Sequence, residues 1–279
     1  MKKYLSIFFI FLILQGCAAT LIKVSPNNMK TIKKIAVVPM EPLPLDMSPL
    51  IPIDEVLRSS LQTSSSSATI QAYSPPPPGT GKAGYMISGI LMLANLPEAR
   101  KGSANTAKCL GEMLSSKDAW IPTKILAQHI ENTINLSGLY DAAVINKTYK
   151  YPEWTNKENW FWFKPLMSWY KKDVSPFIYK DLNSQGIEGV IEVGLGLFLD
   201  HGPLSGDYLA IFTCLKLIDT GTGRVTGKAM HDGFKHNEVK TGDINSLFAN
   251  NGERFKKLFA EASSEIITKE LKRIGILPE

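Results

Sequence analysis

The chain has 279 residues, of which 44% are hydrophobic and 20% charged, with a formal net charge of +5 at pH 7. This length suffices for one large α/β domain or two small ones. The basic excess is mild and includes no Lys/Arg cluster, which argues against nucleic acid as a partner.

The amino terminus has the pattern of a secretory signal. Lys2 and Lys3 precede an almost entirely apolar run at 4–14, which is too short to span a bilayer because a spanning helix needs ~20 apolar residues. The run ends in Leu14-Gln15-Gly16-Cys17, which resembles the processing site of bacterial lipoproteins. The resemblance implies a diacylglycerol on Cys17, removal of residues 1–16 and acylation of the new amino terminus.

A lipid anchor of this kind determines where the protein is held. Each buried methylene contributes ~0.8 kcal/mol, so two or three acyl chains hold a protein stably on a membrane. Ala18 follows the cysteine, and by resemblance to enterobacterial sorting the absence of Asp there favours the outer membrane, facing the periplasm. We expect residues 17–30 to form a polar, structureless lipidated tether with a reach of ~20 Å.

Residues 31–279 are expected to form a single α/β domain. The apolar run at 35–38 follows two lysines and is closed by Pro39; it lacks alternation, which predicts a central strand buried on both faces. Residues 41–121 read as a Pro/Ser-rich insertion, with four serines at 64–67 and four prolines at 75–78. The insertion is expected to elaborate the domain, not to form another one.

Regular structure is predicted again from Pro122. Thr123 is expected to cap a helix that ends at Gly138 and carries an apolar stripe of Leu126, Ile130 and Ile134. A strand is expected at 142–145, followed by an aromatic-rich segment at 151–170. Ser175-Pro176 has the pattern of a helix start, with the serine as cap, and the helix is expected to end at Gly186.

The carboxyl-terminal third predicts an antiparallel hairpin and a helix. Alternating residues at 193–199 predict a strand, followed by an apolar strand at 208–218, a turn at 220–223 and a return strand at 224–234. An apolar stripe then predicts a helix from Phe255 to Ile274, stopped by Gly275 and Pro278. The expected fold is therefore α/β, a mixed sheet with an antiparallel hairpin and helices packed on it.

Four pieces of sequence carry a family resemblance: IAVVP at 35–39, LSGLY at 136–140, QGIEGVIEV at 185–193 and LIDTGTGRV at 217–225. In this order they resemble the α/β domain shared by the curli-secretion lipoprotein, the B-type penicillin-binding-protein activator lipoprotein and the TolB amino-terminal domain. The resemblance implies that α/β fold in an envelope lipoprotein. The insertion at 41–121 and the aromatic segment depart from the pattern.

Three motifs are candidates for chemistry. Asp219-Thr220-Gly221 resembles the aspartic-protease signature, but that chemistry needs a second carboxylate, and the sequence holds no second such motif; a hairpin turn is the alternative. His231 and His236, with Asp232, have weak metal-ligand spacing. The stretch 79–83 lacks the first glycine and the hydroxyl residue of a phosphate loop. No catalytic, metal or cofactor residue is therefore assigned.

The aromatic segment is the strongest candidate for a contact surface, because Trp and Tyr are enriched in binding hot spots and at membrane interfaces. Packing of these rings over the sheet edge is the alternative. Separately, Cys109 and Cys214 can form a disulfide in the periplasm or remain two buried thiols. The residues expected on the interaction surface are Trp154, Trp160, Trp162 and Trp169.

These features favour a non-enzymatic envelope lipoprotein that contacts a protein partner as an assembly or accessory factor, with the membrane bound through Cys17. A subunit of an outer-membrane secretion pore is one alternative, disfavoured because 85–96 alone has a suitable length for a membrane strand and is apolar on both faces. An envelope hydrolase, using Asp219 or the two histidines, is the other.

Replacing the modified cysteine tests the anchor directly. In a Cys17→Ser variant we expect palmitate labelling to disappear and the protein to leave the membrane fraction, because the thioether needs the sulfur. Radiolabelling and cell fractionation measure both effects. Unchanged fractionation of the variant would refute the lipid anchor.

Overall fold

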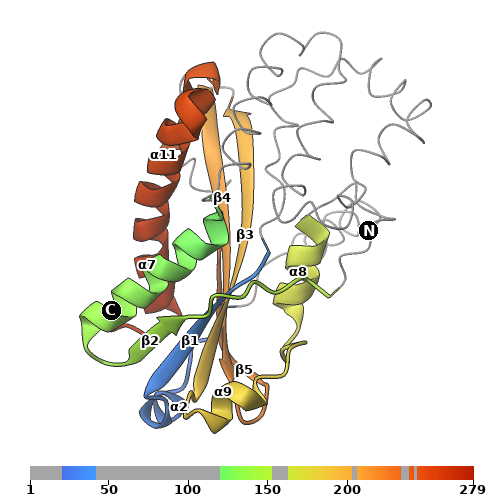
Figure 1. Cartoon of the computed structure of the whole chain (residues 1–279), viewed down its shortest axis with the longest axis vertical. Coiled ribbons are helices and arrows are strands. Elements are labelled where there is room, and N and C mark those ends of the chain that lie inside the picture. The colour runs from blue at the N-terminus through green and yellow to red at the C-terminus, as the bar shows by residue number, and fades with distance from the viewer. Residues whose placement is uncertain (1–20, 42–119, 153–162, 203–205, 234–238, 242–243) are drawn as a thin grey trace, which may run out of the picture.

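The computed structural model describes residues 21–41, 120–152, 163–202, 206–233, 239–241 and 244–279. Their sheet has the strand order β2-β1-β3-β4-β5, with β6 paired to β4. Helices lie on both faces of this sheet (Figure 1). The sheet mixes parallel and antiparallel pairs, so the predicted α/β class is confirmed.

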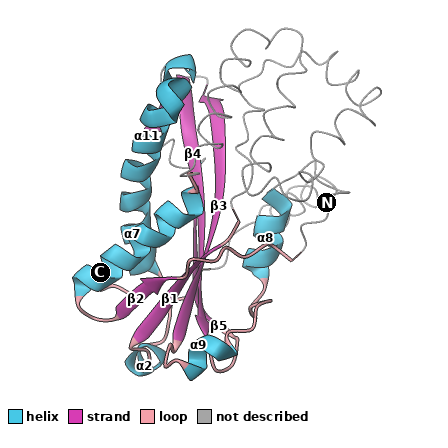
Figure 2. Cartoon of the chain, viewed as in Figure 1, coloured by secondary structure: helices cyan, strands magenta, loops and turns pink. Residues whose placement is uncertain are grey.

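The strands are β1 (Lys34–Pro39), β2 (Asp141–Val144), β3 (Gly189–Gly202), β4 (Gly206–Asp219), β5 (Val225–His231) and β6 (Val239–Lys240). The helices are α2 (Pro26–Thr31), α7 (Pro122–Ser137), α8 (Phe163–Lys171), α9 (Lys180–Ser184) and α11 (Ile244–Arg273). Figure 2 shows how the strands form the central layer between them. None of the helices in the described ranges has the length and apolar character needed to cross a membrane.

Strand β1 lies inside the sheet, between β2 and β3, and is buried on both faces, as its unbroken apolar run predicts. It pairs in parallel with β2 on one side and β3 on the other. Ile35 and Val37 are buried in the core beneath α7 and α11, whereas Ala36 and Val38 are buried on the opposite face. Burial on both faces explains why no polar residue alternates along this strand.

Strands β3 and β4 form a long antiparallel hairpin, and β1, β5 and β6 all pair with one of its two strands. Val193, Leu195 and Leu197 face the core shared with α7 and α11. The alternate residues of β3 face α8, and Glu192 lies in register with Lys216 of β4 on that side. The predicted alternation is therefore confirmed for these positions.

Helix α7 is confirmed, but its predicted cap is wrong. The residue before the helix is Ile121, whose side chain makes no capping hydrogen bond, and Pro122 occupies the first turn. Thr123 is fully buried inside the helix instead. Proline at the first turn lacks the N–H that a cap would otherwise satisfy, and Gly138 ends the helix in the left-handed conformation, with φ 66°.

Helix α11 starts earlier than its apolar stripe predicts and contains a break. Residues 249–252 leave helical geometry, and Asn250, Asn251 and Gly252 all have left-handed φ values. Asn and Gly are the residues that adopt this conformation most readily. The break places Phe248 and Phe255, one on each side, with ring centroids 5.0 Å apart in the core.

The helix predicted between Ser175 and Gly186 is present, but its predicted start is wrong. Residues 172–179, here called the strap, connect α8 to α9 and are not helical; α9 begins only at Lys180. Residues that precede proline disfavour helical geometry, and the Ser175 hydroxyl is bonded to Glu192 of the sheet instead of capping a helix. Tertiary contacts thus override a local start signal.

The expectation of a structureless tether at 17–30 needs correction in its described part. Ile22 exchanges two backbone hydrogen bonds with Lys228, of 2.9 and 3.0 Å, and Val24 donates to the carbonyl of Ile274. Ser25 caps the short helix α2, and Met29 is buried against the core. From Leu21 onward the chain therefore belongs to the domain, because its apolar side chains find sites beside the sheet.

Both edges of the sheet are covered over part of their length. On β5, the bridges of Ile22 and Val174 cover the outer edge. On β2, the Asn135 amide of α7 bonds both the N–H and the C=O of Ala142, at 2.8 and 2.9 Å, and Glu131 accepts from the Val144 N–H. These side chains occupy groups that an added strand would need.

A glycine in β3 determines how closely α8 approaches the sheet. A Cβ at Gly194 would lie 2.7 Å from both Leu166 and Trp169 of α8, and 3.1 Å from the Tyr151 hydroxyl. These neighbours are themselves buried, so they have little room to move. The missing side chain is therefore a packing requirement.

We expect Gly194→Ala to lower the free energy of unfolding by about 1–3 kcal/mol, because the methyl group overpacks the contact with α8. Gly221→Ala is the matched control: its Cβ would meet nothing closer than 3.5 Å, so its effect should stay within about 0.5 kcal/mol. Urea denaturation measures both. Equal stability of the two variants would contradict the close approach.

Candidate functional site

The residues predicted for an interaction surface fall into two groups. Cys17, Trp154, Trp160 and Trp162 lie outside the described residues. Trp169 is described, and it is not on the surface: only 1% of it is exposed. Its assignment to an interaction surface is wrong, because α8 directs the ring onto the sheet.

The indole of Trp169 reaches a carboxylate in the middle of β3. Its Nε1–H donates to Glu192 Oε2 at 2.9 Å, and its ring packs edge-on against Tyr151 with centroids 5.6 Å apart. A buried Trp needs a hydrogen-bond partner for its N–H, and Glu192 supplies it. The last turn of α8 is therefore fixed to the sheet by a polar contact as well as by packing.

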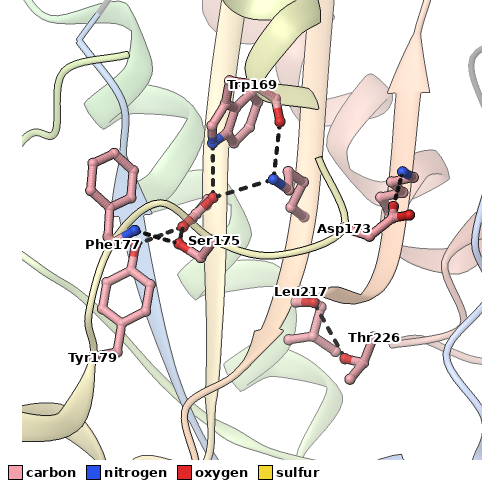
Figure 3. Close-up of polar contacts among 10 residues, drawn as sticks. Trp169, Asp173, Ser175, Phe177, Tyr179, Leu217 and Thr226 are labelled. Carbon is pink, nitrogen blue, oxygen red and sulfur yellow. Dashed lines mark hydrogen bonds and ion pairs between the residues drawn. The ribbon is translucent and has the colours of Figure 1, made fainter. Parts of the chain in front are cut away.

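Two strap residues bind the same carboxylate. The Ser175 hydroxyl and the Tyr179 hydroxyl both donate to Glu192 Oε1, the second at 2.9 Å. Figure 3 shows Trp169, Ser175 and Tyr179 converging on this point, with Phe177 beside them. Burial, together with the charge of Glu192, raises the pKa of Tyr179 far above its usual value, so this phenol remains a proton donor.

Lys216 supplies the opposite charge from the neighbouring strand. Its Nζ lies 4.0 Å from Glu192 Oε2, and neither side chain has exposed surface. The ammonium also donates to the Trp169 carbonyl at 3.1 Å and lies 4.9 Å from the Trp169 ring centroid. Burial lowers the pKa of Lys216 to about 8, against the opposing effect of Glu192.

A second lysine holds the strap closer to the sheet edge. Lys228 of β5 has a side chain only 4% exposed, and its Nζ lies 2.6 Å from Asp173 Oδ1. This hydrogen bond lowers the pKa of Asp173. The same Nζ lies 5.6 Å from the ring centroid of Tyr170, so one ammonium contacts both the end of α8 and the start of the strap.

We call these residues the Glu192 cluster: Trp169, Asp173, Ser175, Tyr179, Glu192, Lys216 and Lys228. Its carboxylate accepts three hydrogen bonds, and its two central charges are enclosed. Glu192, Lys216 and their hydrogen-bond donors lie in a low-dielectric interior, where such bonds are strong, whereas the Asp173 side chain is exposed at the edge of the cluster. This arrangement holds α8 and the strap on the sheet.

The structure assigns ordinary structural roles to the other motif residues that it describes. Asp219 Oδ1 accepts from the N–H and the hydroxyl of Thr222, each at 2.7 Å, which is the hairpin-turn alternative. His231 is buried against α11, with Nδ1 3.8 Å from Glu270 Oε1, while His236 lies outside the described residues. No group of three His, Cys, Asp or Glu in the described ranges is placed to hold a metal ion.

The thiol of Cys214 belongs to the same face of the sheet as α8. It is a buried free thiol in the structure, and burial raises its pKa. Cys109 lies outside the described residues. The choice between a Cys109–Cys214 disulfide and two buried thiols therefore stays a prediction.

The central charge pair of the Glu192 cluster could have been predicted from the sequence, although none of the motifs discussed above includes it. Glu192 and Lys216 are single charged residues of opposite sign inside two long apolar runs. An antiparallel pairing of those runs that joins Gly189 to Asp219 also places these two charges opposite each other. Because a buried charge needs a partner, this register could have been used to predict the pair.

No protein-family model and no curated protein matches the chain. Among solved structures, the PelC dodecamer from Paraburkholderia phytofirmans is similar in two crystal forms. A variant in one form has a TM-score of 0.28 and 12% identity, covering 88% of this chain and 93% of that chain. The other form has a TM-score of 0.26 and 13% identity, covering 54% and 76%. TM-scores this low do not establish a common fold, so nothing is transferred from PelC to this chain.

We expect Glu192→Gln to lower the free energy of unfolding by about 3–5 kcal/mol, because it leaves Lys216 buried without its counter-charge. The matched control is Glu261→Gln, which alters a surface pair with Lys257 at 4.0 Å and should cost less than about 1 kcal/mol. Denaturation curves at pH 7 measure both.

A second substitution separates the charge pair from general disruption of the site. Adding Lys216→Met to Glu192→Gln removes the unpaired charge, so the double variant should be more stable than Glu192→Gln alone. If the double variant is instead less stable than Glu192→Gln, the two charges are not coupled.

Proposed function

We propose that this protein is a non-enzymatic bacterial envelope lipoprotein, anchored to the outer membrane through Cys17 and facing the periplasm. It acts through contacts with an envelope protein, as an assembly or accessory factor. The proposed location is supported by the short apolar run and the Leu-Gln-Gly-Cys motif at residues 14–17.

The position of the residues on either side of 153–162 supports the proposal that the protein acts by binding a partner. Tyr151, before residues 153–162, is 3% exposed, and its ring packs against Trp169 of α8, which follows them. The described residues on either side of 153–162 therefore meet at one site on the sheet. Trp154, Trp160 and Trp162 lie between these two fixed ends.

The Glu192 cluster explains why these ends are rigid. Apolar contacts of Leu166 and Tyr170 hold α8 on the sheet, and the hydrogen bonds of Glu192 and the two lysines fix the orientation of its last turn. A rigid base reduces the entropy that a binding segment loses when it meets a partner. The hydrogen bonds and ion pairs of the Glu192 cluster, which lie next to the aromatic segment, therefore support the proposal that this segment binds a protein partner.

Site-specific crosslinking tests the proposed contact. With a photoreactive phenylalanine analogue at position 160, we expect a discrete adduct with an envelope protein in intact cells, because aromatic residues concentrate at binding hot spots. Position 136 is the control: Leu136 is 88% exposed on α7, next to the opposite edge of the sheet. Identical adducts from both positions, or none from position 160, would refute the proposed surface.

A further inference from the structure

The strap has an unusual outward face. Burial alternates along it: Ser175 and Tyr179 are buried and Phe177 is partly buried, while Val174, Pro176 and Ile178 are exposed. Val174 is 54% exposed and Ile178 81%. Val174, Pro176 and Ile178, here called the outer row, form a short exposed apolar row, and apolar residues grouped together and bordered by polar ones can mark a contact site.

The outer row is surrounded by basic residues. These exposed cations, here called the basic rim, are Lys171, Lys172, Lys180 and Arg224. The acidic residues in the same stretch are Asp173, which is exposed but paired with Lys228, and the exposed Asp181 of α9. Apolar side chains flanked by cations match a lipid surface with acidic headgroups, where the apolar groups enter the interface and the cations meet phosphate.

The amino-terminal segment brings the anchor to the same edge of the sheet. Ile22 is bonded to Lys228 of β5 and lies five positions after Cys17, a reach of at most roughly 17 Å. Val174 bridges to Arg224, the residue before β5, four positions or roughly 13 Å from Lys228 along the strand. Ile22 and the strap are thus bonded to the same edge strand, and from there Val24 continues toward α11, where it donates to the Ile274 carbonyl.

The opposite side carries a different surface. Helix α11, which covers the other face of the sheet, exposes charges of both signs, including Glu253, Lys257 and Glu261. Such a mixed surface is typical of contact with water. Helix α7, on the same side, also exposes Leu136. The two sides therefore differ in charge: the exposed charges around the strap are mainly basic, whereas those of α11 are of both signs.

We propose that the outer row and the basic rim rest on the acidic lipid surface to which Cys17 is anchored. This inference depends on the lipid anchor of the proposed function and adds a defined orientation to it. The α8 and strap side faces the lipid, and the layer formed by α7 and α11 faces away.

A fluorescence quenching experiment on the full lipidated chain tests this orientation. Ile178→Cys, in a Cys109→Ser background, is labelled with an environment-sensitive dye in vesicles of phosphatidylethanolamine and phosphatidylglycerol that contain spin-labelled lipid. We expect quenching at position 178 and none at the matched control Leu136→Cys. The background without an added cysteine measures any labelling of buried Cys214.

The outcomes separate the two proposals. Protein that does not float with the vesicles would refute the lipid anchor and this inference with it. Protein that floats with equal quenching at both positions, or with none at position 178, would overturn the orientation while leaving the anchor in place. Protection of position 178 by concentration-dependent self-association would assign the outer row to a second copy instead.

Charge reversal tests the basic rim. Lys172→Glu with Arg224→Glu should abolish quenching at position 178, because the acidic headgroups then repel the strap. Lys257→Glu with Lys269→Glu, two exposed residues of α11, changes the net charge equally and should leave quenching unchanged. An equal loss in both double variants would show that net charge, and not the rim, determines the result.

Discussion

The buried carboxylate of Glu192 is the constraint on which the α8 face of this domain depends. Taking a carboxylate out of water is costly unless a counter-charge and hydrogen bonds replace the lost solvation. Lys216 supplies the charge, while Trp169, Ser175 and Tyr179 supply the hydrogen bonds. These donors come from α8 and the strap, so the carboxylate is satisfied only when both lie on the sheet.

The need to satisfy Glu192 connects the core of the domain to the two proposed contact surfaces, the aromatic segment and the outer row. Gly194 allows α8 to approach β3 closely, and the Glu192 cluster then fixes the end of the helix and directs the strap across the sheet. The same strap turns Val174 and Ile178 outward. One polar interaction therefore positions both the base of the aromatic segment and the row of exposed apolar residues beside the β5 edge.

Much of the fold was predictable because it follows from hydrophobic periodicity. The unbroken run before Pro39 gave the central strand, the stripe from Leu126 to Ile134 gave α7, and alternation around Leu195 gave the hairpin. The helix start at Ser175-Pro176 and the surface position of Trp169 are wrong for a different reason. Local residue preferences predict both, but Ser175 and Trp169 instead hydrogen-bond Glu192, which is distant in the sequence. No local pattern shows that burying Glu192 requires these partners.

The sequence by itself determined the α/β class and the order of the main strands and helices, because these depend on residue types and spacings within short windows; the lipid anchor at Cys17 stays a prediction from the same kind of pattern. Only the tertiary structure decided that residues 22–24 are bound at the β5 edge, that Trp169 is buried and that the strap is not helical. Each of these depends on which distant groups meet across the sheet, where burial and the need to pair charges outweigh the preferences of neighbouring residues.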